Sequence, residues 1–241
     1  MRSASRDGDI GTAWSKAVTA TRLTPAMVGE AKTLLGLLGI PVLQAPSEGE
    51  AQAAALARTG VAWAVGSKDY DSLLFGTPRL AWFVAVGSRE LLPSRGISRP
   101  VPPEVIELEP WLRGLGLSRE QLIDVAILVG TDFNDGVRGV GPKTAVKLIR
   151  EHGRLEGLPA EIQAALPGNF DSVREFFLNP PVASAGDTVQ GSFSEEGVVR
   201  FLCDEREFSR GRVSLAVGRL QSRRLDRRRL EDFTSEPETV K

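Results

Sequence analysis

Two pairs of carboxylates, each pair separated by a single residue, are the residues in this sequence most able to do chemistry. Glu48 and Glu50 lie in the stretch APSEGEAQAAALA, and Asp69 and Asp71 lie in GSKDYDSLLFG. A fifth carboxylate, Asp132, follows an apolar run that ends in ILVGTD. Crowded carboxylates repel one another unless cations neutralise them, and oxygen ligands suit Mg²⁺ or Mn²⁺. The pattern therefore favours a divalent-cation site that supports phosphoryl transfer.

Each pair also has a purely structural explanation. Ser47 and Glu50 match the S-x-x-E capping box, so Glu50 could serve only to close the start of a helix. Asp69 and Asp71 could be ordinary turn residues. Two pairs that follow two predicted strands, together with Asp132, favour one metal site over these separate explanations.

Composition narrows the chemistry further. The 241 residues include one histidine, His152, and one cysteine, Cys203. Catalysis built on histidine is therefore disfavoured, and an intrachain disulfide or a zinc site made of cysteine pairs is excluded. No apolar run approaches the ~20 residues that span a bilayer, so no membrane partner is expected. The expected compartment is the cytoplasm of a prokaryote or archaeon, or the nucleus of a eukaryote.

The apolar pattern predicts the elements that position the carboxylates. A helix is expected over residues 25–38, and short strands over 39–45, 61–67 and 80–86, with a helix between the first two strands. Alternation of strands and helices predicts an α/β fold with a mostly parallel sheet flanked by helices. Ligands bind at the carboxyl ends of such strands, and both acidic pairs follow strand ends.

The second half of the chain is predicted to be helical and contains a glycine-rich turn. The stretch GVRGVGPKTAVKLI (136–149) puts Gly139 and Gly141 before Pro142 at a helix start, where backbone N–H groups can bind an anion. The cations that recur on one face of this helix are Lys143, Lys147 and Arg150. They could line the phosphates of a nucleic acid. The alternative is a tight turn between two helices with solvated lysines.

Five stretches together resemble the XPG-type structure-specific nucleases, and most closely the flap endonucleases of archaeal and eukaryotic replication. They are GIPVLQAPSEGEAQAAALA, GSKDYDSLLFG, AILVGTDFNDGVRGVGPKTAVKLI, FFLNPPV and FLCDEREFS. The resemblance implies a nuclease core of the PIN or 5′-nuclease type, followed by a helical region with a helix–two-turn–helix. It also implies a 5′-flap endonuclease and 5′–3′ exonuclease of DNA replication and repair that acts as a monomer on double-stranded DNA with a 5′ single-stranded flap.

The resemblance also implies site residues, at the positions where this sequence matches the motifs of the family. Two Mg²⁺ ions, replaceable by Mn²⁺, would be held by Glu48, Glu50, Asp69, Asp71 and Asp132. A K⁺ ion would be held by the backbone carbonyls of Gly136, Val137 and Val140. The duplex backbone would be contacted by Gly139, Gly141, Lys143, Lys147 and Arg150. The tail carries a partial match to the peptide that binds a PCNA-type sliding clamp, at Leu230 and Phe233; a disordered tail is the alternative.

The chain also departs from the family pattern. Family members normally have a further amino-terminal third, which holds the first strand of the sheet, two more metal-binding aspartates and most of a helical arch. Lys68 replaces an uncharged or acidic residue and should weaken metal binding slightly. A non-catalytic duplex-binding fragment or paralogue is therefore an alternative; an unrelated Mg²⁺-dependent phosphatase would explain the carboxylates but not the glycine turn. The expected parts are a remnant of the arch-following segment (1–24), the nuclease core (25–115), the helical DNA-binding region (116–221) and a basic, then disordered tail (222–241).

Overall fold

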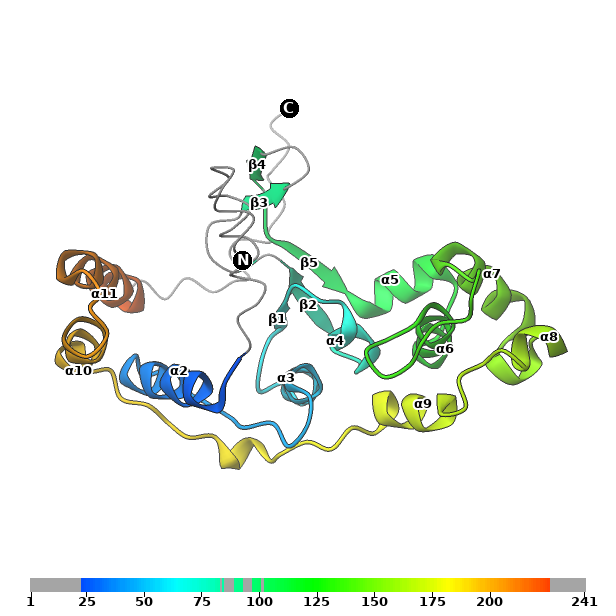
Figure 1. Cartoon of the computed structure of the whole chain (residues 1–241), viewed down its shortest axis with the longest axis horizontal. Helices are drawn as coiled ribbons and strands as arrows, with labels where there is room; N and C mark the ends of the chain where they lie inside the picture. The colour runs from blue at the N-terminus through cyan, green and yellow to red at the C-terminus, as the bar shows by residue number, and fades with distance from the viewer. Residues whose placement is uncertain (1–22, 83, 85–88, 93–96, 101, 226–241) are drawn as a thin grey trace, which may run out of the picture. The chain divides into compact units, whose positions relative to one another are not determined.

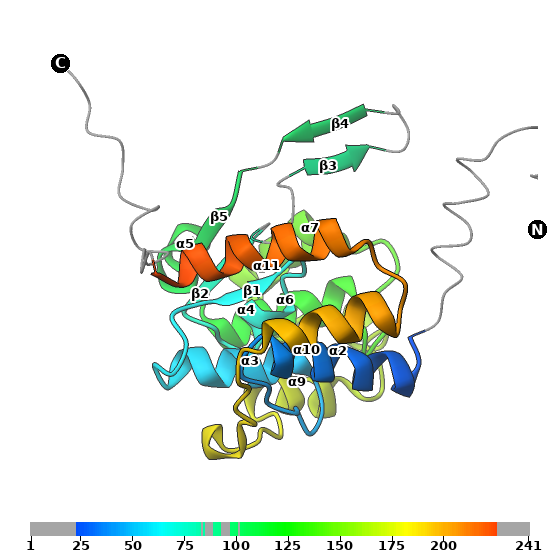
Figure 2. The same cartoon turned by 90° about the vertical axis from the view of Figure 1, so that its left-hand side faces the viewer.

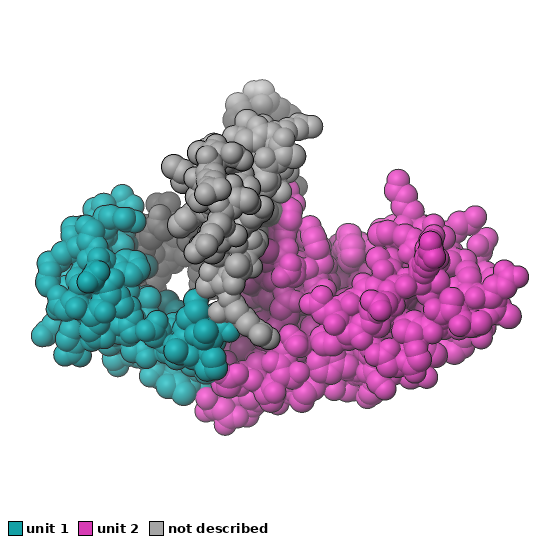
Figure 3. Space-filling view, viewed as in Figure 1, with its two compact units in different colours: residues 1–42, 188–241 teal, residues 43–187 magenta. Residues whose placement is uncertain are grey.

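In the computed structural model, the described residues are 23–82, 84, 89–92, 97–100 and 102–225 (Figure 1). The predictions for residues 1–22 and for the tail from 226 onward, including Leu230 and Phe233, lie outside this part. The described chain divides into two compact units (Figure 3). Leu43–Asp187 form the central unit, and the residues before and after this range form the terminal unit. The predicted boundary between residues 115 and 116 falls inside the central unit.

The central unit contains a three-stranded sheet of order β1-β2-β5, consistent with the predicted α/β class. β1 (Val65–Ser67) pairs in parallel with β2 (Arg79–Trp82), and β2 pairs antiparallel with β5 (Glu104–Glu107). The sequence predicts a mostly parallel sheet, whereas the three strands of this sheet make one parallel and one antiparallel pairing. The connection from β2 to β5 carries the antiparallel pair β3 (Arg89–Leu92) and β4 (Ile97–Pro100) instead of the crossover helix that a parallel pairing requires.

The predicted strand over residues 39–45 is wrong. The structure has a single isolated bridge there, in which Val42 and Val189 exchange backbone hydrogen bonds of 3.0 and 2.8 Å. An apolar run becomes a strand only where a neighbouring segment offers a ladder of partners, and that information is not local. β1 begins only at Val65, so it is shorter than the strand predicted over 61–67. β2 overlaps the strand predicted over 80–86, whose residues 83, 85 and 86 lie outside the described part.

Helices make up most of the remaining central unit. They are α3 (Gly49–Arg58), α4 (Asp71–Leu74), α5 (Leu108–Leu115), α6 (Arg119–Val129), α7 (Pro142–His152), α8 (Ala160–Gln163), α9 (Phe170–Leu178) and the 3₁₀ turns η1 (Leu155–Gly157) and η2 (Ala185–Asp187). Phe75 and Phe177 are fully buried and lie 4.9 Å apart between ring centroids, and Phe133 and Phe176 are equally close. These rings join α4, α9 and the loop after α6 into one core.

A buried ion cluster holds α6 against the helices that follow it. Asp124 is fully buried, and its carboxylate accepts from Arg154 Nε at 2.6 Å and from Arg174 Nε at 2.8 Å. A buried charge is tolerated only where it is paired in this way, and removing one partner is strongly destabilising. The cluster therefore fixes α6 relative to η1 and α9.

The terminal unit consists of α2 (Pro25–Leu37), α10 (Glu195–Val199), the π-helical turn η3 (Arg200–Asp204) and α11 (Arg210–Leu225), with α10 beside both α2 and α11 (Figure 2). Val198, Val213 and Val217 form its buried centre. The arginine-rich stretch that begins at Arg210 is thus helical through Leu225. None of the described helices is both long and apolar enough to cross a membrane.

The loop between α6 and α7 folds back so closely that two glycines approach each other through the backbone. A Cβ on Gly136 would lie 2.1 Å from the Val129 carbonyl oxygen. Gly130 has φ of 108°, and a Cβ there would lie 2.9 Å from the Gly136 nitrogen. Only glycine fits this approach, and the approach fixes where the next residues lie.

We therefore expect Gly136→Ala to destabilise the chain by more than about 2 kcal/mol, because backbone must move to accommodate the methyl group. Thermal unfolding should show a midpoint lowered by roughly 4 °C or more. Gly168→Ala is the matched control, since a Cβ there meets nothing within 4 Å. Equal midpoints for the two variants would contradict the close approach.

Candidate metal centre

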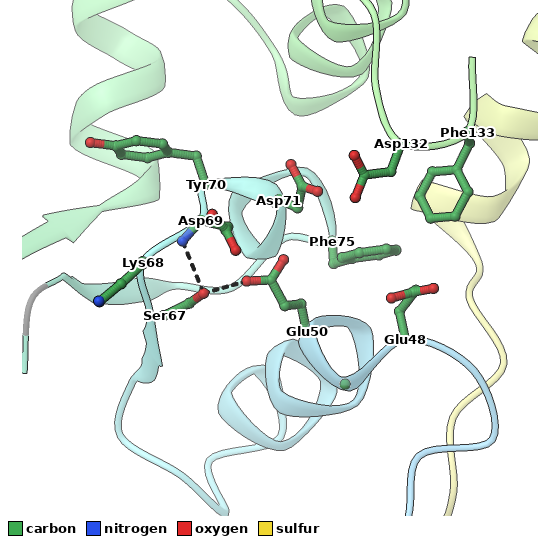
Figure 4. A pocket seen from close by; sticks show the side chains of 11 residues that line it. Glu48, Glu50, Ser67, Lys68, Asp69, Tyr70, Asp71, Phe75, Asp132 and Phe133 are labelled. Atoms are coloured by element: carbon green, nitrogen blue, oxygen red, sulfur yellow. Dashed lines mark hydrogen bonds between the residues drawn. The ribbon is translucent and has the colours of Figure 1, made fainter. Parts of the chain in front are cut away.

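One pocket of the central unit, of about 820 Å³, collects all five carboxylates singled out from the sequence (Figure 4). They come from three separate segments: the start of α3, the loop after β1, and the turn after α6. These residues are Glu48, Glu50, Asp69, Asp71 and Asp132. The structure therefore brings them together, while their role as metal ligands stays a prediction.

Glu50 is held toward the pocket by a serine at the end of β1. α3 begins at Gly49, and its N-cap is Glu48, which makes no side-chain capping bond, so the capping-box interpretation of Ser47 and Glu50 is wrong. Instead, Ser67 Oγ donates to Glu50 Oε1 at 2.5 Å (Figure 4). The same Ser67 oxygen accepts the backbone N–H of Asp69 at 3.1 Å. One hydroxyl thus ties the first acidic segment to the second.

Asp71 begins α4, a single helical turn whose other end is fixed by two arginines. Arg58 Nη1 donates to the Phe75 carbonyl at 2.7 Å, and Arg119 Nε donates to the Leu74 carbonyl at 2.9 Å. Cations suit the C-terminal end of a helix and carboxylates its N-terminal end. The short helix is therefore oriented so that its first residue faces the pocket.

Asp132 lies in a tight turn that is cross-linked by side chains. Thr131 Oγ1 donates to Asn134 Oδ1 at 2.8 Å and accepts the Phe133 N–H at 3.1 Å. Asn134 Nδ2 donates to the Ile127 carbonyl at 2.9 Å, which anchors the turn to the end of α6. Together with the contact between the two glycines, these bonds fix the position of the Asp132 backbone.

The electrostatics of the pocket are those of a functional site. Burial raises the pKa of Glu50, and the neighbouring carboxylates raise it further, against the opposing effect of the hydrogen bond from Ser67. Burial also raises the pKa of Asp71, with further contributions from Asp132, Asp69 and Glu48. Carboxylates held in a cleft with raised pKa values are typical of catalytic and metal sites.

The donor set fits a hard divalent cation by its chemistry. The lining residues supply five carboxylates and the hydroxyls of Ser67 and Tyr70, without sulfur or imidazole, and oxygen ligands are those that Mg²⁺ and Mn²⁺ prefer. Within the described residues, no group of three such side chains is close enough to coordinate one ion as placed. The carboxylates repel one another in this arrangement unless a cation neutralises them. Lys68 points away from them, so its ammonium does not lie among the ligands (Figure 4).

The predicted glycine turn joins α6 to α7, two helices that pack closely. Gly139 has φ of 84°, and Gly141 is the N-cap of α7. Lys143 and Lys147 are exposed on α7, as a phosphate-binding role requires. Arg150 has a partner that the sequence does not reveal, because its guanidinium donates to the Leu115 carbonyl at the end of α5.

The carbonyls predicted to hold K⁺ belong to the same turn. The Val137 carbonyl accepts the Val140 N–H at 3.0 Å, and the Val137 N–H donates to the Leu128 carbonyl at 2.8 Å. Val137 is buried, so the turn is anchored to the end of α6 on both sides of Asp132.

Comparison with known proteins finds similarity to flap endonucleases. Residues 39–132 match the family described as XPG I-region. Flap endonuclease 1 of Thermococcus onnurineus is 44% identical over 215 residues, which are 89% of this chain and 62% of that protein. Flap endonuclease 1 of Methanopyrus kandleri is 49% identical over 207 residues, 83% of this chain and 60% of that protein. The solved structure of flap endonuclease-1 from Methanococcus jannaschii matches with a TM-score of 0.71 and 34% identity, over 90% of this chain and 65% of that one.

Over these segments the chain is similar to flap endonucleases. It spans 60% to 65% of the length of these relatives. Members of the flap endonuclease family are metal-dependent nucleases, in agreement with a pocket of carboxylates.

Sequence reasoning missed the residues that hold these carboxylates in place. Ser67 could have been noticed as a hydroxyl that ends an apolar strand two residues before Asp69. Thr131 and Asn134 flank Asp132 within a short glycine-bounded stretch, which is a weaker signal. Arg119 carries no local signal, because its partners are 45 and 58 residues away.

Replacing Asp71 by asparagine should stabilise the chain at neutral pH. A raised folded-state pKa means that the folded chain binds this proton more tightly than the unfolded chain, so stability falls as pH rises through the folded value. We expect Asp71→Asn to raise the thermal midpoint by on the order of 2 °C at about pH 7.5 in EDTA. The gain should vanish near about pH 3.5, below the ordinary value of 3.8, where the carboxyl is protonated anyway.

Asp135→Asn is the control, because Asp135 is exposed and is not among the residues that line the pocket. A lower midpoint for Asp71→Asn than for the unaltered chain at neutral pH would show that the Asp71 carboxylate is a structural group.

Proposed function

We propose that this chain acts as a metal-dependent, structure-specific nuclease that hydrolyses a phosphodiester of DNA at the base of a 5′ single-stranded flap, in replication and repair. The observation that carries the proposal is the position of Asp132, which shares a pocket with four other carboxylates and lies in the turn that leads into the exposed lysines of α7. One short element thus carries both an acidic site and a candidate phosphate-binding surface. The length preference of the flap and the balance of endonuclease and exonuclease activity are not part of the proposal.

In this proposal the chain's own residues bind the metal ions and the DNA and orient them. The carboxylates would hold two Mg²⁺ ions, or Mn²⁺, and these ions would lower the pKa of bound water and neutralise charge on the phosphate. Ser67 keeps Glu50 facing the pocket, and the Thr131–Asn134 turn keeps Asp132 at a set position along the duplex. Lys143 and Lys147 contact phosphates, with a K⁺ ion held at the carbonyls of the α6–α7 turn.

The partners beyond DNA rest on the sequence alone. Leu230 and Phe233 would dock a PCNA-type sliding clamp, and the chain would act as a monomer. A non-catalytic duplex-binding role is the second candidate, and one observation favours it: among the described side chains, no three carboxylates already stand close enough to share an ion. The first experiment below separates the two.

Asp69→Ala and Asp132→Ala should each lower the rate of Mg²⁺-dependent flap cleavage by at least about 100-fold, because each removes a metal ligand. Their affinity for the uncleaved flap DNA should stay within a few-fold of the unaltered chain. Asp135→Ala, which changes an exposed carboxylate near Asp132, should cleave normally. Unaltered cleavage by Asp69→Ala and Asp132→Ala would rule out the metal assignment, and binding without any cleavage by the unaltered chain would favour the non-catalytic role.

Lys143→Ala combined with Lys147→Ala should weaken binding to duplex DNA and lower the slope of log K against log salt concentration by about 2, since each phosphate contact contributes about 1. Arg113→Ala combined with Arg212→Ala removes the same charge from exposed positions on α5 and α11 and should leave the slope nearly unchanged. Equal slopes for the two double variants would count against the role of α7.

A further inference from the structure

The segment from Ser67 to Asp71 presents two kinds of side chain in alternation. Ser67, Asp69 and Asp71 serve the carboxylate cluster, whereas Lys68 and Tyr70 extend away from it (Figure 4). Lys68 and Tyr70 nevertheless line the same pocket. Neither the core nor the metal site accounts for a cation and an aromatic ring at this place.

Tyr70 forms an exposed aromatic surface whose ring packs against a second aromatic ring. Its side chain is 50% exposed, and its ring lies 5.8 Å from that of Trp82, with 31° between the ring planes. The parallel pairing of β1 and β2 puts Trp82 opposite Ser67, and Trp82 Nε1 donates to the Lys68 carbonyl at 2.8 Å. The indole is therefore fixed in place, and the tyrosine ring rests against a rigid neighbour. Such a ring is ordered in advance and loses little freedom when a planar group binds to it.

We propose that Lys68 and Tyr70 form a binding subsite for the unpaired nucleotide next to the phosphodiester that the carboxylates hold, with the base stacked on Tyr70 and its phosphate contacted by Lys68. The proposal rests on the proposed nuclease function. Tyr70 lies between Asp69 and Asp71 in the chain, so a DNA strand that crosses the carboxylates passes beside the ring. Every base offers a π-face, so such stacking tolerates any sequence, as a structure-specific enzyme requires.

The same geometry explains how the subsite would favour unpaired DNA. A base inside a duplex already stacks on both faces, and exposing a face costs unstacking energy, least for a base that is already single-stranded. Lys68 adds positive charge beside the bound DNA strand, on the side that faces away from the carboxylates. The departure of Lys68 from the family pattern then contributes to substrate binding without placing an ammonium among the carboxylates.

The test measures binding separately from cleavage. A fluorescent flap DNA is titrated with the chain in Ca²⁺ instead of Mg²⁺, and its anisotropy is compared with that of DNAs that lack one base on either side of the flap junction. Tyr70→Ala should lose about 10-fold in affinity for the complete DNA, because the base loses the ring on which it stacks, and should lose almost nothing further on one of the abasic DNAs. Tyr70→Phe, which keeps the ring, should bind as the unaltered chain does.

Two further variants separate stacking from simpler explanations. Tyr70→Leu keeps apolar volume without a π-face and should behave as Tyr70→Ala; full affinity in Tyr70→Leu would overturn the stacking role. Lys68→Ala should weaken binding to complete and abasic DNA equally and lower the salt slope by about 1. Unfolding midpoints identify any variant that fails to fold. The comparison of Tyr70→Phe with Tyr70→Leu then decides whether Tyr70 binds the base by stacking. Equal losses by Tyr70→Ala on complete and abasic DNA would also overturn the subsite.

A cleavage assay in Mg²⁺ distinguishes failure of the subsite from failure of the proposed function. Base-dependent binding through Tyr70 without any cleavage would support the subsite and contradict the nuclease function. Cleavage by Tyr70→Ala with the KM and kcat of the unaltered chain would support the nuclease function and contradict the subsite.

Discussion

Repulsion among the five carboxylates in one pocket is the constraint on which the rest of the central unit depends. Glu50 and Asp71 are partly buried, and each has several other acidic groups nearby, so the ionised cluster opposes folding. The three segments that carry the carboxylates are each held by residues outside the five. Ser67 donates to Glu50 on α3, Arg58 and Arg119 donate to carbonyls at the end of α4, and Thr131 donates to Asn134 after α6. A site that costs stability when its acids are ionised is what a cation-binding function predicts.

The loop that carries Asp132 also sets the distance between the carboxylates and α7. Asp132 and the start of α7 belong to one loop, and that loop is fixed to the end of α6 by the approach of Gly136 to Gly130 and by Val137. α6 is fixed in turn by the ion pairs of Asp124. The separation between a phosphate bound at α7 and a phosphate at the carboxylates is therefore set by rigid parts. A nuclease that cuts at a defined distance from a duplex end needs such a fixed separation, in the same way that catalysis needs preorganised groups.

The sequence predicts which carboxylates gather in one pocket better than it predicts the bounds of the strands, while their role as metal ligands stays a prediction. The carboxylates and the glycine turn were predictable because their spacing is local, and the turn is followed by a helix that begins with Pro142 as expected. The strand over 39–45 was not, because pairing depends on a partner such as Val189 that lies far along the chain. Arg119 and Ser67 act through partners on other elements, and no local pattern marks such contacts. The resemblance to flap endonucleases came from long matching stretches, which carry more information than composition or periodicity.

The central claim is that five carboxylates from three segments form one divalent-cation site. Electron paramagnetic resonance of Mn²⁺ titrated into the chain tests it most directly, because free and bound Mn²⁺ give different signals and Mg²⁺ should displace the bound ion. The account predicts saturable Mn²⁺ binding that weakens at least about 10-fold when Asp71 or Asp132, on different segments, is replaced by the amide. Mn²⁺ binding of the same affinity in both variants and in the unaltered chain would contradict it.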